Sequence, residues 1–117
     1  MRVNTRLHHD LLIIEPKERI TDETEPQFTE LVRLLLEGGS RRLVLNLADV
    51  PHIDSVGLGA IVQAYTSARR YGGDLKLLRV RPRNRQLLTI TKILTVLEAY
   101  ETEEEVERSF VEASSLY

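Results

Sequence analysis

The apolar residues of this chain fall into short continuous runs, separated by stretches in which they recur at helical spacing. Short apolar runs bounded by polar or turn-forming residues are typical of strands. The run at residues 43–47 is almost uninterrupted, which indicates a strand covered on both faces within a parallel sheet. The predicted strands are residues 3–7, 11–14, 43–47, 75–80 and 95–97.

Four segments with apolar residues at spacings of three and four predict amphipathic helices. The first begins at residues 22–25, whose carboxylates meet the positive end of the helix dipole, and Pro26 suits the first helical turn. The last begins at Thr102 and Glu105, which form a Thr-x-x-Glu capping box. The first and second helices end at the glycine pairs 38–39 and 72–73. The third spans about residues 83–93. The apolar face of the second helix consists of Leu58, Ile61, Val62 and Tyr65.

The order of these elements predicts a single domain. A strand, a helix and a strand in succession form a parallel crossover unit, which is almost always right-handed. Domain sizes peak at roughly 100–150 residues, so a chain of 117 residues favours one domain that covers residues 1–117. We therefore expect an α/β fold in which helices pack on a central sheet.

Composition narrows the class of protein. With 42% hydrophobic and 29% charged residues, the chain can bury a core and stay soluble. Its 16 basic and 18 acidic residues give a net charge of -2, so neither nucleic acid nor an anionic membrane is an expected partner. The absence of cysteine excludes disulfides and thiolate metal sites. The apolar runs are too short to cross a bilayer and the N-terminus has no signal-peptide pattern, so we expect a cytoplasmic protein.

Candidate chemistry concentrates in residues 48–57, between the predicted strand at residues 43–47 and the following helix. Strand-to-helix loops usually span about 2–6 residues, so this one is long. It lies at the carboxyl end of a strand and the amino end of a helix, where open α/β sheets place binding sites and helix amides favour an anion. Either Asp54 or Ser55 can cap the helix, and Gly57 permits the close approach of another backbone.

The same segment carries a family resemblance. Residues 43–50 read Leu-Val-Leu-Asn-Leu-Ala-Asp-Val, and residues 53–59 read Ile-Asp-Ser-Val-Gly-Leu-Gly. This pattern resembles the signature of the STAS family, which includes the bacterial anti-sigma factor antagonists: an apolar strand ending in Asn-Leu, an acidic bend, and Asp-Ser-x-Gly-Leu at a helix start. The similarity extends over nearly the whole chain. It implies a STAS-like domain with a mixed, mostly parallel sheet of four to five strands and four helices.

The resemblance implies a protein-binding module that is not an enzyme and needs no cofactor or metal, present as a monomer or weak dimer. In the antagonists, the serine after the aspartate is phosphorylated by the partner, an anti-sigma factor that is itself a serine kinase; here that residue is Ser55. The unmodified form would bind the anti-sigma factor, phosphorylation would release it, and a serine phosphatase would restore binding. The implied phosphosite support is Asp54 and Gly57, and the implied partner surface is Ser55, Val56 and Leu58, with Thr21 and Asp22 beside them if the loop after the second strand lies next to this one.

The chain departs from the family pattern at three places. Residues 18–21, Glu-Arg-Ile-Thr, replace a Gly-x-apolar-Asp turn that normally lies beside the phosphoserine. Val56 stands where serine or alanine is frequent, which enlarges the apolar surface at the site. Residues 91–93 replace a common Ser-Gly-Leu. These changes bear on the phosphorylation cycle and on the identity of the partner, and hardly on the fold.

Three other functions are compatible with the sequence. The chain could be a scaffold subunit of a signalling assembly, a non-switching subunit of a transporter complex in which Ser55 is only a cap, or a weak nucleotide hydrolase using residues 57–59. A serine hydrolase is a poor fit, because a nucleophile elbow needs glycine where Ile53 stands. A phosphate-accepting receiver domain also fails, because only Glu15 is available to hold Mg²⁺ at the end of the first strand.

Two neighbouring histidines, His8 and His9, could suggest metal binding. Neighbours on a strand point to opposite faces, so we expect that these two side chains cannot comfortably share an ion. We therefore interpret both as surface histidines.

Overall fold

The strands of the central sheet lie in sequence order. A computed structural model describes the backbone of residues 1–115 and the side chains of residues 1–111. In this part of the chain β1 pairs antiparallel with β2, and the pairs β2–β3, β3–β4 and β4–β5 are parallel. The strands are β1 (Val3–His8), β2 (Leu11–Pro16), β3 (Arg42–Asn46), β4 (Asp74–Leu78) and β5 (Ala99–Tyr100). The helices are α1 (Glu25–Glu37), α2 (Ser55–Arg70), α3 (Pro82–Ile90), the 3-10 helix η1 (Ile93–Thr95) and α4 (Glu103–Ser115).

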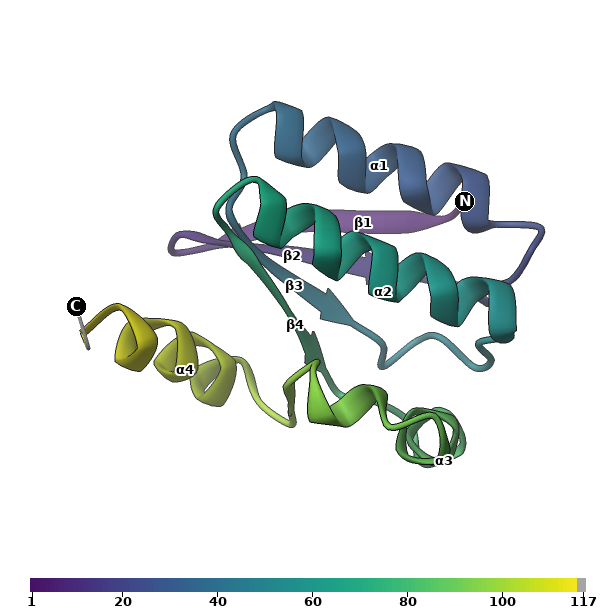
Figure 1. Cartoon of the computed structure of the whole chain (residues 1–117). Coiled ribbons are helices and arrows are strands. Elements are labelled where there is room, and N and C mark those ends of the chain that lie inside the picture. Colours follow the sequence, from purple (N-terminus) through teal and green to yellow (C-terminus); the bar gives the residue numbers. More distant parts are fainter. Residues whose placement is uncertain (116–117) are drawn as a thin grey trace.

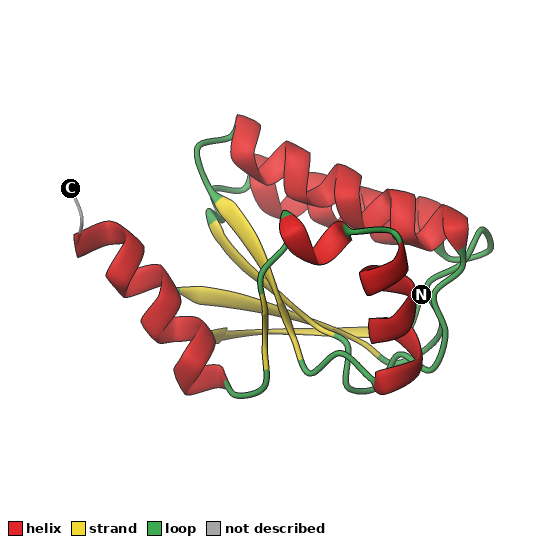
Figure 2. Cartoon of the chain, turned by 60° about the horizontal axis from the view of Figure 1, so that its bottom comes forward, coloured by secondary structure: helices red, strands yellow, loops and turns green. Residues whose placement is uncertain are grey.

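Helices cover both faces of the sheet. α1 and α2 lie side by side on one face, and α4 lies against the other (Figure 1, Figure 2). Because side chains alternate along a strand, Ile14 and Leu45 pack toward α1 and α2, whereas Ile13 and Val44 pack toward α4. The described residues thus form a mixed, mostly parallel sheet with four α-helices, which confirms the predicted fold class. Among residues 1–115, none of the helices combines the length and the apolar character that a membrane span requires.

The predicted strand at residues 95–97 is wrong. Lys92 has a left-handed backbone, with a φ of 61°, and the chain continues from it into η1. Leu97 is almost completely buried but does not belong to a strand, so its apolar character reflects the core and not sheet pairing. The final strand is instead the two-residue β5, which pairs with β4. α3 likewise ends at Ile90, three residues earlier than the periodicity predicted.

The β1–β2 hairpin places its two histidines differently from the prediction. His8 is the last residue of β1, but His9 lies in the turn and has a left-handed backbone, with a φ of 57°. The alternation of side chains therefore stops at His9, and both imidazoles lie against Glu107 of α4. The two ring centroids are 4.4 Å apart. The expectation that these side chains diverge is wrong, because it holds only for two residues within a strand.

Candidate functional site

The site begins at the carboxyl end of β3, where the buried Asn46 holds the start of the long loop. Its side-chain nitrogen donates to Oε2 of Glu15 over 2.9 Å, and its side-chain oxygen accepts from the backbone N–H of Ala48 over 3.1 Å. Burial alone would raise the pKa of Glu15, but hydrogen bonds from Arg6 and two asparagines outweigh that effect and lower it. An ionised Glu15 therefore fixes the orientation of Asn46, and Asn46 fixes the direction in which the loop leaves the sheet.

The loop between β3 and α2 consists of residues 47–54. Hydrogen bonds attach it to α3 and to Arg81, the N-cap residue of that helix. Asn84, with only 2% of its surface exposed, donates from Nδ2 to the carbonyl oxygen of Val50 over 2.8 Å. Arg81 donates from Nε to a second loop carbonyl over 2.7 Å. Because buried polar groups are almost always paired, the buried hydrogen bond from Asn84 fixes the position of the loop backbone at Val50. The sequence interpretation missed Asn84; its position four residues before the buried Leu88, on the same helical face, was the available signal.

A second loop, which follows β2, runs beside the first. Ile20 and Ile53 form an isolated parallel bridge, and both side chains are buried. The N–H of Ile20 donates to the carbonyl of His52 over 3.1 Å, and the N–H of Asp54 donates to the carbonyl of Ile20 over 3.3 Å. The loop after β2 therefore lies next to the start of α2, which is the condition on which the predicted partner surface depended.

Gly57, in the first turn of α2, packs against the same stretch of backbone. A Cβ atom at position 57 would lie 1.9 Å from the carbonyl oxygen of Ile20 and 2.7 Å from its carbonyl carbon. Any side chain here would therefore force the two loops apart. The close backbone approach that the sequence indicated at Gly57 is present, and Ile20 is the residue approached.

Asp54 caps α2 and ties the two loops together. Its Oδ1 accepts from the N–H of Gly57 over 2.7 Å, and its Oδ2 accepts from the N–H of Asp22 over 3.2 Å. The backbone of Asp54 is extended, as a helix N-cap requires. The hydrogen bond from Gly57 is the main cause that lowers the pKa of Asp54, with smaller contributions from two other backbone N–H groups. Of the two candidate caps, Asp54 takes the position, and Ser55 becomes the first residue of the helix.

The residues of the predicted partner surface differ in how much they expose. Ser55 and Asp22 are exposed, Thr21 is half-buried, and Val56 exposes 44% of its surface. Leu58, in contrast, is buried and belongs to the core between the sheet and the two covering helices. The accessible side chains at this end of α2 are thus the hydroxyl of Ser55 and the apolar Val56, together with the carboxylate of Asp22 in the neighbouring loop. Leu58 packs in the core beneath the start of the helix.

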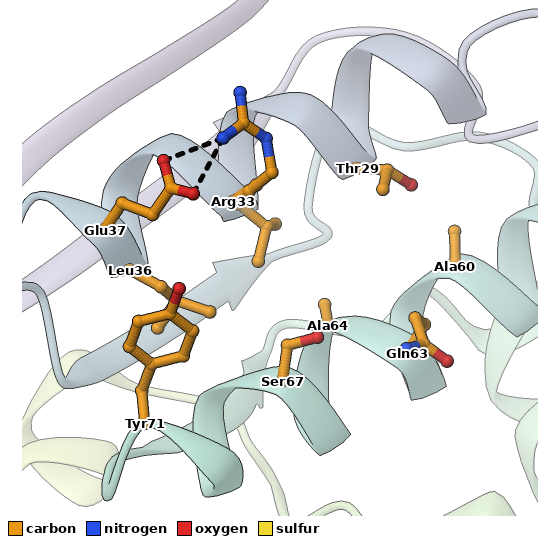
Figure 3. A pocket seen from close by; sticks show the side chains of 10 residues that line it. Thr29, Arg33, Leu36, Glu37, Ala60, Gln63, Ala64, Ser67 and Tyr71 are labelled. Atoms are coloured by element: carbon orange, nitrogen blue, oxygen red, sulfur yellow. Dashed lines mark hydrogen bonds and ion pairs between the residues drawn. The ribbon is translucent and has the colours of Figure 1, made fainter.

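A hollow of about 310 Å³ lies between the outer sides of α1 and α2 (Figure 3). Small side chains such as Ala60 and Ala64 line it from α2, and from α1 Arg33 lines it while pairing with Glu37 over 2.7 Å. The side chains around Asp54 do not line this hollow. Ser55 lies outside it at the exposed start of α2, a position suited to contact with a macromolecule, whereas small ligands are usually enclosed in a cavity.

Comparisons with known proteins identify the domain. The family model described as the STAS domain matches residues 2–106. An anti-sigma F factor antagonist of Paenibacillus polymyxa is 24% identical over 108 residues, covering 88% of this chain and 89% of the relative. The crystal structure of a candidate anti-sigma factor antagonist of Thermotoga maritima matches with a TM-score of 0.86 and 26% identity over 92% of both chains. The Bacillus protein SpoIIAA in its phosphorylated form shares the fold, with a TM-score of 0.70 and 14% identity over 92% of this chain and 99% of that one. The chain therefore belongs to the STAS domain family, among relatives that are named anti-sigma factor antagonists.

Proposed function

We propose that this chain is an anti-sigma factor antagonist that is switched by phosphorylation of Ser55. In its unmodified form it binds an anti-sigma factor with serine kinase activity, phosphorylation releases it, and a serine phosphatase restores the binding form. It works in the cytoplasm as a binding module, as a monomer or weak dimer, and not as an enzyme. The observation that carries the proposal is that Asp54 and Ser55 have different roles at the start of α2. Asp54 provides the cap, so the exposed Ser55 can be modified without loss of that cap.

Phosphorylation would change the charge of this surface more than the fold beneath it. A phosphoserine carries about -1.5 to -2 charges at pH 7, and Asp54, with its lowered pKa, is already an anion beside it. The positive end of the α2 dipole offsets part of this charge, by about 0.3–1 kcal/mol at an exposed helix N-terminus. The domain can therefore carry the phosphate, whereas a partner fitted to a neutral hydroxyl meets both bulk and like charge.

The energy that such a switch must supply is small. Each loss of about 1.4 kcal/mol weakens binding tenfold, so a few kcal/mol make a micromolar complex negligible. Like-charge contact and a lost apolar fit at the same place can provide this amount. The apolar fit would come from Val56, because Leu58 is buried and has little surface to offer a partner. Thr21 and Asp22 of the neighbouring loop complete the proposed contact surface.

Two other functions use the same fold. In a scaffold subunit of a signalling assembly, the phosphosite would tune packing between STAS domains. In a transporter complex that contacts an ATPase, Ser55 would only begin the helix. The antagonist function is favoured because the Paenibacillus polymyxa relative, named as an antagonist, aligns over 89% of its own length.

The test is a titration of Ser55→Ala and Ser55→Asp against an anti-sigma kinase encoded in the same genome, with and without ATP. Ser55→Ala should bind and resist release by ATP, and Ser55→Asp should bind poorly, although it carries less charge than a phosphate. Intact-mass analysis of the wild type should show one phosphate, which Ser55→Ala lacks and the control Ser67→Ala, at the far end of α2, retains. Equal binding by the two Ser55 variants, with no phosphate on the wild type, would leave Ser55 as a helix residue only and favour the transporter function.

A further inference from the structure

Three metal-ligating side chains meet at the end of the molecule opposite the Ser55 surface. His8 and His9 come from the β1–β2 hairpin, at the amino end of β2, whereas Ser55 follows the carboxyl end of β3. Glu107 reaches them from α4, the helix on the other face of the sheet (Figure 1). Residues that are 98 and 99 positions apart in the chain are thus brought together by the docking of α4 on the sheet.

The three ligand atoms converge. Nε2 of His8 lies 3.6 Å from Oε1 of Glu107, and Nδ1 of His9 contacts Oε2 of the same carboxylate. All three ligand atoms lie within 4.8 Å of one another. This arrangement depends on the left-handed backbone of His9, which turns its imidazole to the side on which His8 already points.

We propose that His8, His9 and Glu107 form a binding site for Zn²⁺. Zinc binds imidazole nitrogen at about 2.0–2.1 Å and carboxylate oxygen at about 2.0–2.2 Å, which in a tetrahedral site separates ligand atoms by roughly 3.3 Å. The present ligand atoms lie within 4.8 Å of one another, and rotations about the side-chain bonds of Glu107 and the exposed His9 can bring them to this spacing. The carboxylate then moves from the imidazole of His9 to the ion.

The donor set selects the class of ion. Two imidazoles with one carboxylate suit zinc and its transition-metal neighbours, whereas Mg²⁺ and Ca²⁺ prefer oxygen ligands alone. The side chains of His8 and Glu107 are about three-quarters buried, with 29% and 26% exposed, and that of His9 is 70% exposed. Asp10, the next residue of the turn, is engaged by Arg42 over 2.7 Å. The remaining coordination position is therefore left to water or to a ligand from outside.

A metal at this position would bridge two parts of the fold. α4 docks on the sheet through Val106 and Phe110, which pack with Leu11 and Ile13. An ion shared by the hairpin and Glu107 would add a second attachment, at the residue next to Val106 and about one turn of helix before Phe110. Zn²⁺ would bind the arrangement in which α4 is docked and not the undocked one. The free energy that holds α4 on the sheet would therefore increase with the concentration of Zn²⁺.

The experiment uses the untagged full chain near neutral pH. Isothermal titration with ZnCl₂ should give one ion per chain, and Zn²⁺ should raise the melting temperature in a way that a chelator reverses, whereas Mg²⁺ should do neither. His8→Gln, His9→Gln and Glu107→Gln should each weaken binding by about tenfold or more, which is about 1.4 kcal/mol. His52→Gln, which changes the third and last histidine of the chain, is the matched control and should bind as the wild type does.

Spectroscopy separates this site from an unspecific surface ion. Cu²⁺ bound in place of Zn²⁺ should show two nitrogen ligands by electron paramagnetic resonance, and one of them should disappear in either His8→Gln or His9→Gln. Circular dichroism of the metal-free variants checks that each keeps the fold. The proposal fails if Zn²⁺ does not bind, or if the His8, His9 and Glu107 variants bind it no more weakly than His52→Gln does.

Discussion

Gly57 lies in direct backbone contact with the carbonyl group of Ile20, and this contact sets the distance between the two loops of the site. The space between them is so small that a Cβ atom would come within 1.9 Å of the Ile20 oxygen. The same carbonyl oxygen accepts a hydrogen bond from the N–H of Asp54. One carbonyl thus places both the cap of α2 and the first turn of that helix.

Gly57→Ala should destabilise the protein, because the added methyl group collides with backbone that is itself hydrogen-bonded. Overpacking of this kind costs about 1–3 kcal/mol. Gly59→Ala is the matched control two residues further along α2, where a Cβ atom would meet nothing within 4 Å. It should stabilise the protein by up to about 1 kcal/mol, since alanine is the better helix former. Urea unfolding of both variants measures the difference, and equal stabilities would show that the loops can separate freely.

Asp54 should make part of the stability dependent on pH. Its pKa in the folded protein lies below the ordinary value of 3.8, mainly because the N–H of Gly57 donates to the carboxylate. The ionised carboxylate therefore stabilises the folded protein at pH values above its ordinary pKa of 3.8. This contribution is lost as the pH falls through the pKa that Asp54 has in the folded protein. Asp54→Asn should keep the cap but lose this pH dependence, whereas Asp54→Ala should be less stable at neutral pH as well. Urea midpoints at neutral and strongly acidic pH test this; an unchanged acid response in Asp54→Asn would contradict it.

Val56→Glu should weaken the complex with the anti-sigma factor while leaving the fold intact. Replacing an apolar anchor at the centre of an interface weakens binding by about 1 kcal/mol or more. The fold should tolerate the change because the side chain of Val56 is exposed enough to accept a charge. Val111→Glu, at an exposed valine of α4, adds the same charge away from the proposed surface and should bind normally. A large fall in melting temperature with unchanged affinity would mean that Val56 serves the core.

The sequence predicted those elements whose side chains report directly on local structure. The run at residues 43–47 is apolar at almost every position because α1 and α2 cover one face of β3 and α4 covers the other. Residues 95–97 look similar but have a different origin: Leu97 fills the core from a loop, and Val96 is more than half exposed. Apolar character alone therefore does not identify a strand in this segment, because pairing with β4 decides which residues form β5.

The same distinction applies to the candidate site. A cap at Asp54 or Ser55 and a close backbone approach at Gly57 could be inferred from local sequence, but the choice of Asp54 as the cap came from the structure. The contact of Gly57 with Ile20 could not, because the partner lies in another loop and acts through its backbone, which any residue provides. The convergence of His8 and His9 on α4 was hidden for a related reason, since it depends on where the hairpin turn begins.

Asn84 should prove necessary for the long loop, although it lies outside the proposed partner surface. Its amide is the buried donor for the carbonyl of Val50, 34 residues earlier in the chain. Asn84→Ala removes that donor and leaves a buried carbonyl unpaired, which costs about 1–3 kcal/mol. Hydrogen exchange of the backbone amides in residues 48–54 should accelerate, because local opening of the loop becomes easier. Affinity for the anti-sigma factor should fall with it, since Ser55 follows directly after this loop.

Gln86→Ala is the control for this prediction, because Gln86 lies in the same helix with its side chain exposed. Its stability should stay within about 0.5 kcal/mol of the wild type, as is usual for surface positions. Asn84→Asp gives a sharper comparison: it keeps the size of the side chain but replaces the donor with an acceptor facing the carbonyl of Val50. It should therefore be at least as unstable as Asn84→Ala. If Asn84→Asp were as stable as the wild type, with unchanged exchange in residues 48–54, the hydrogen bond to Val50 would not be what holds the loop.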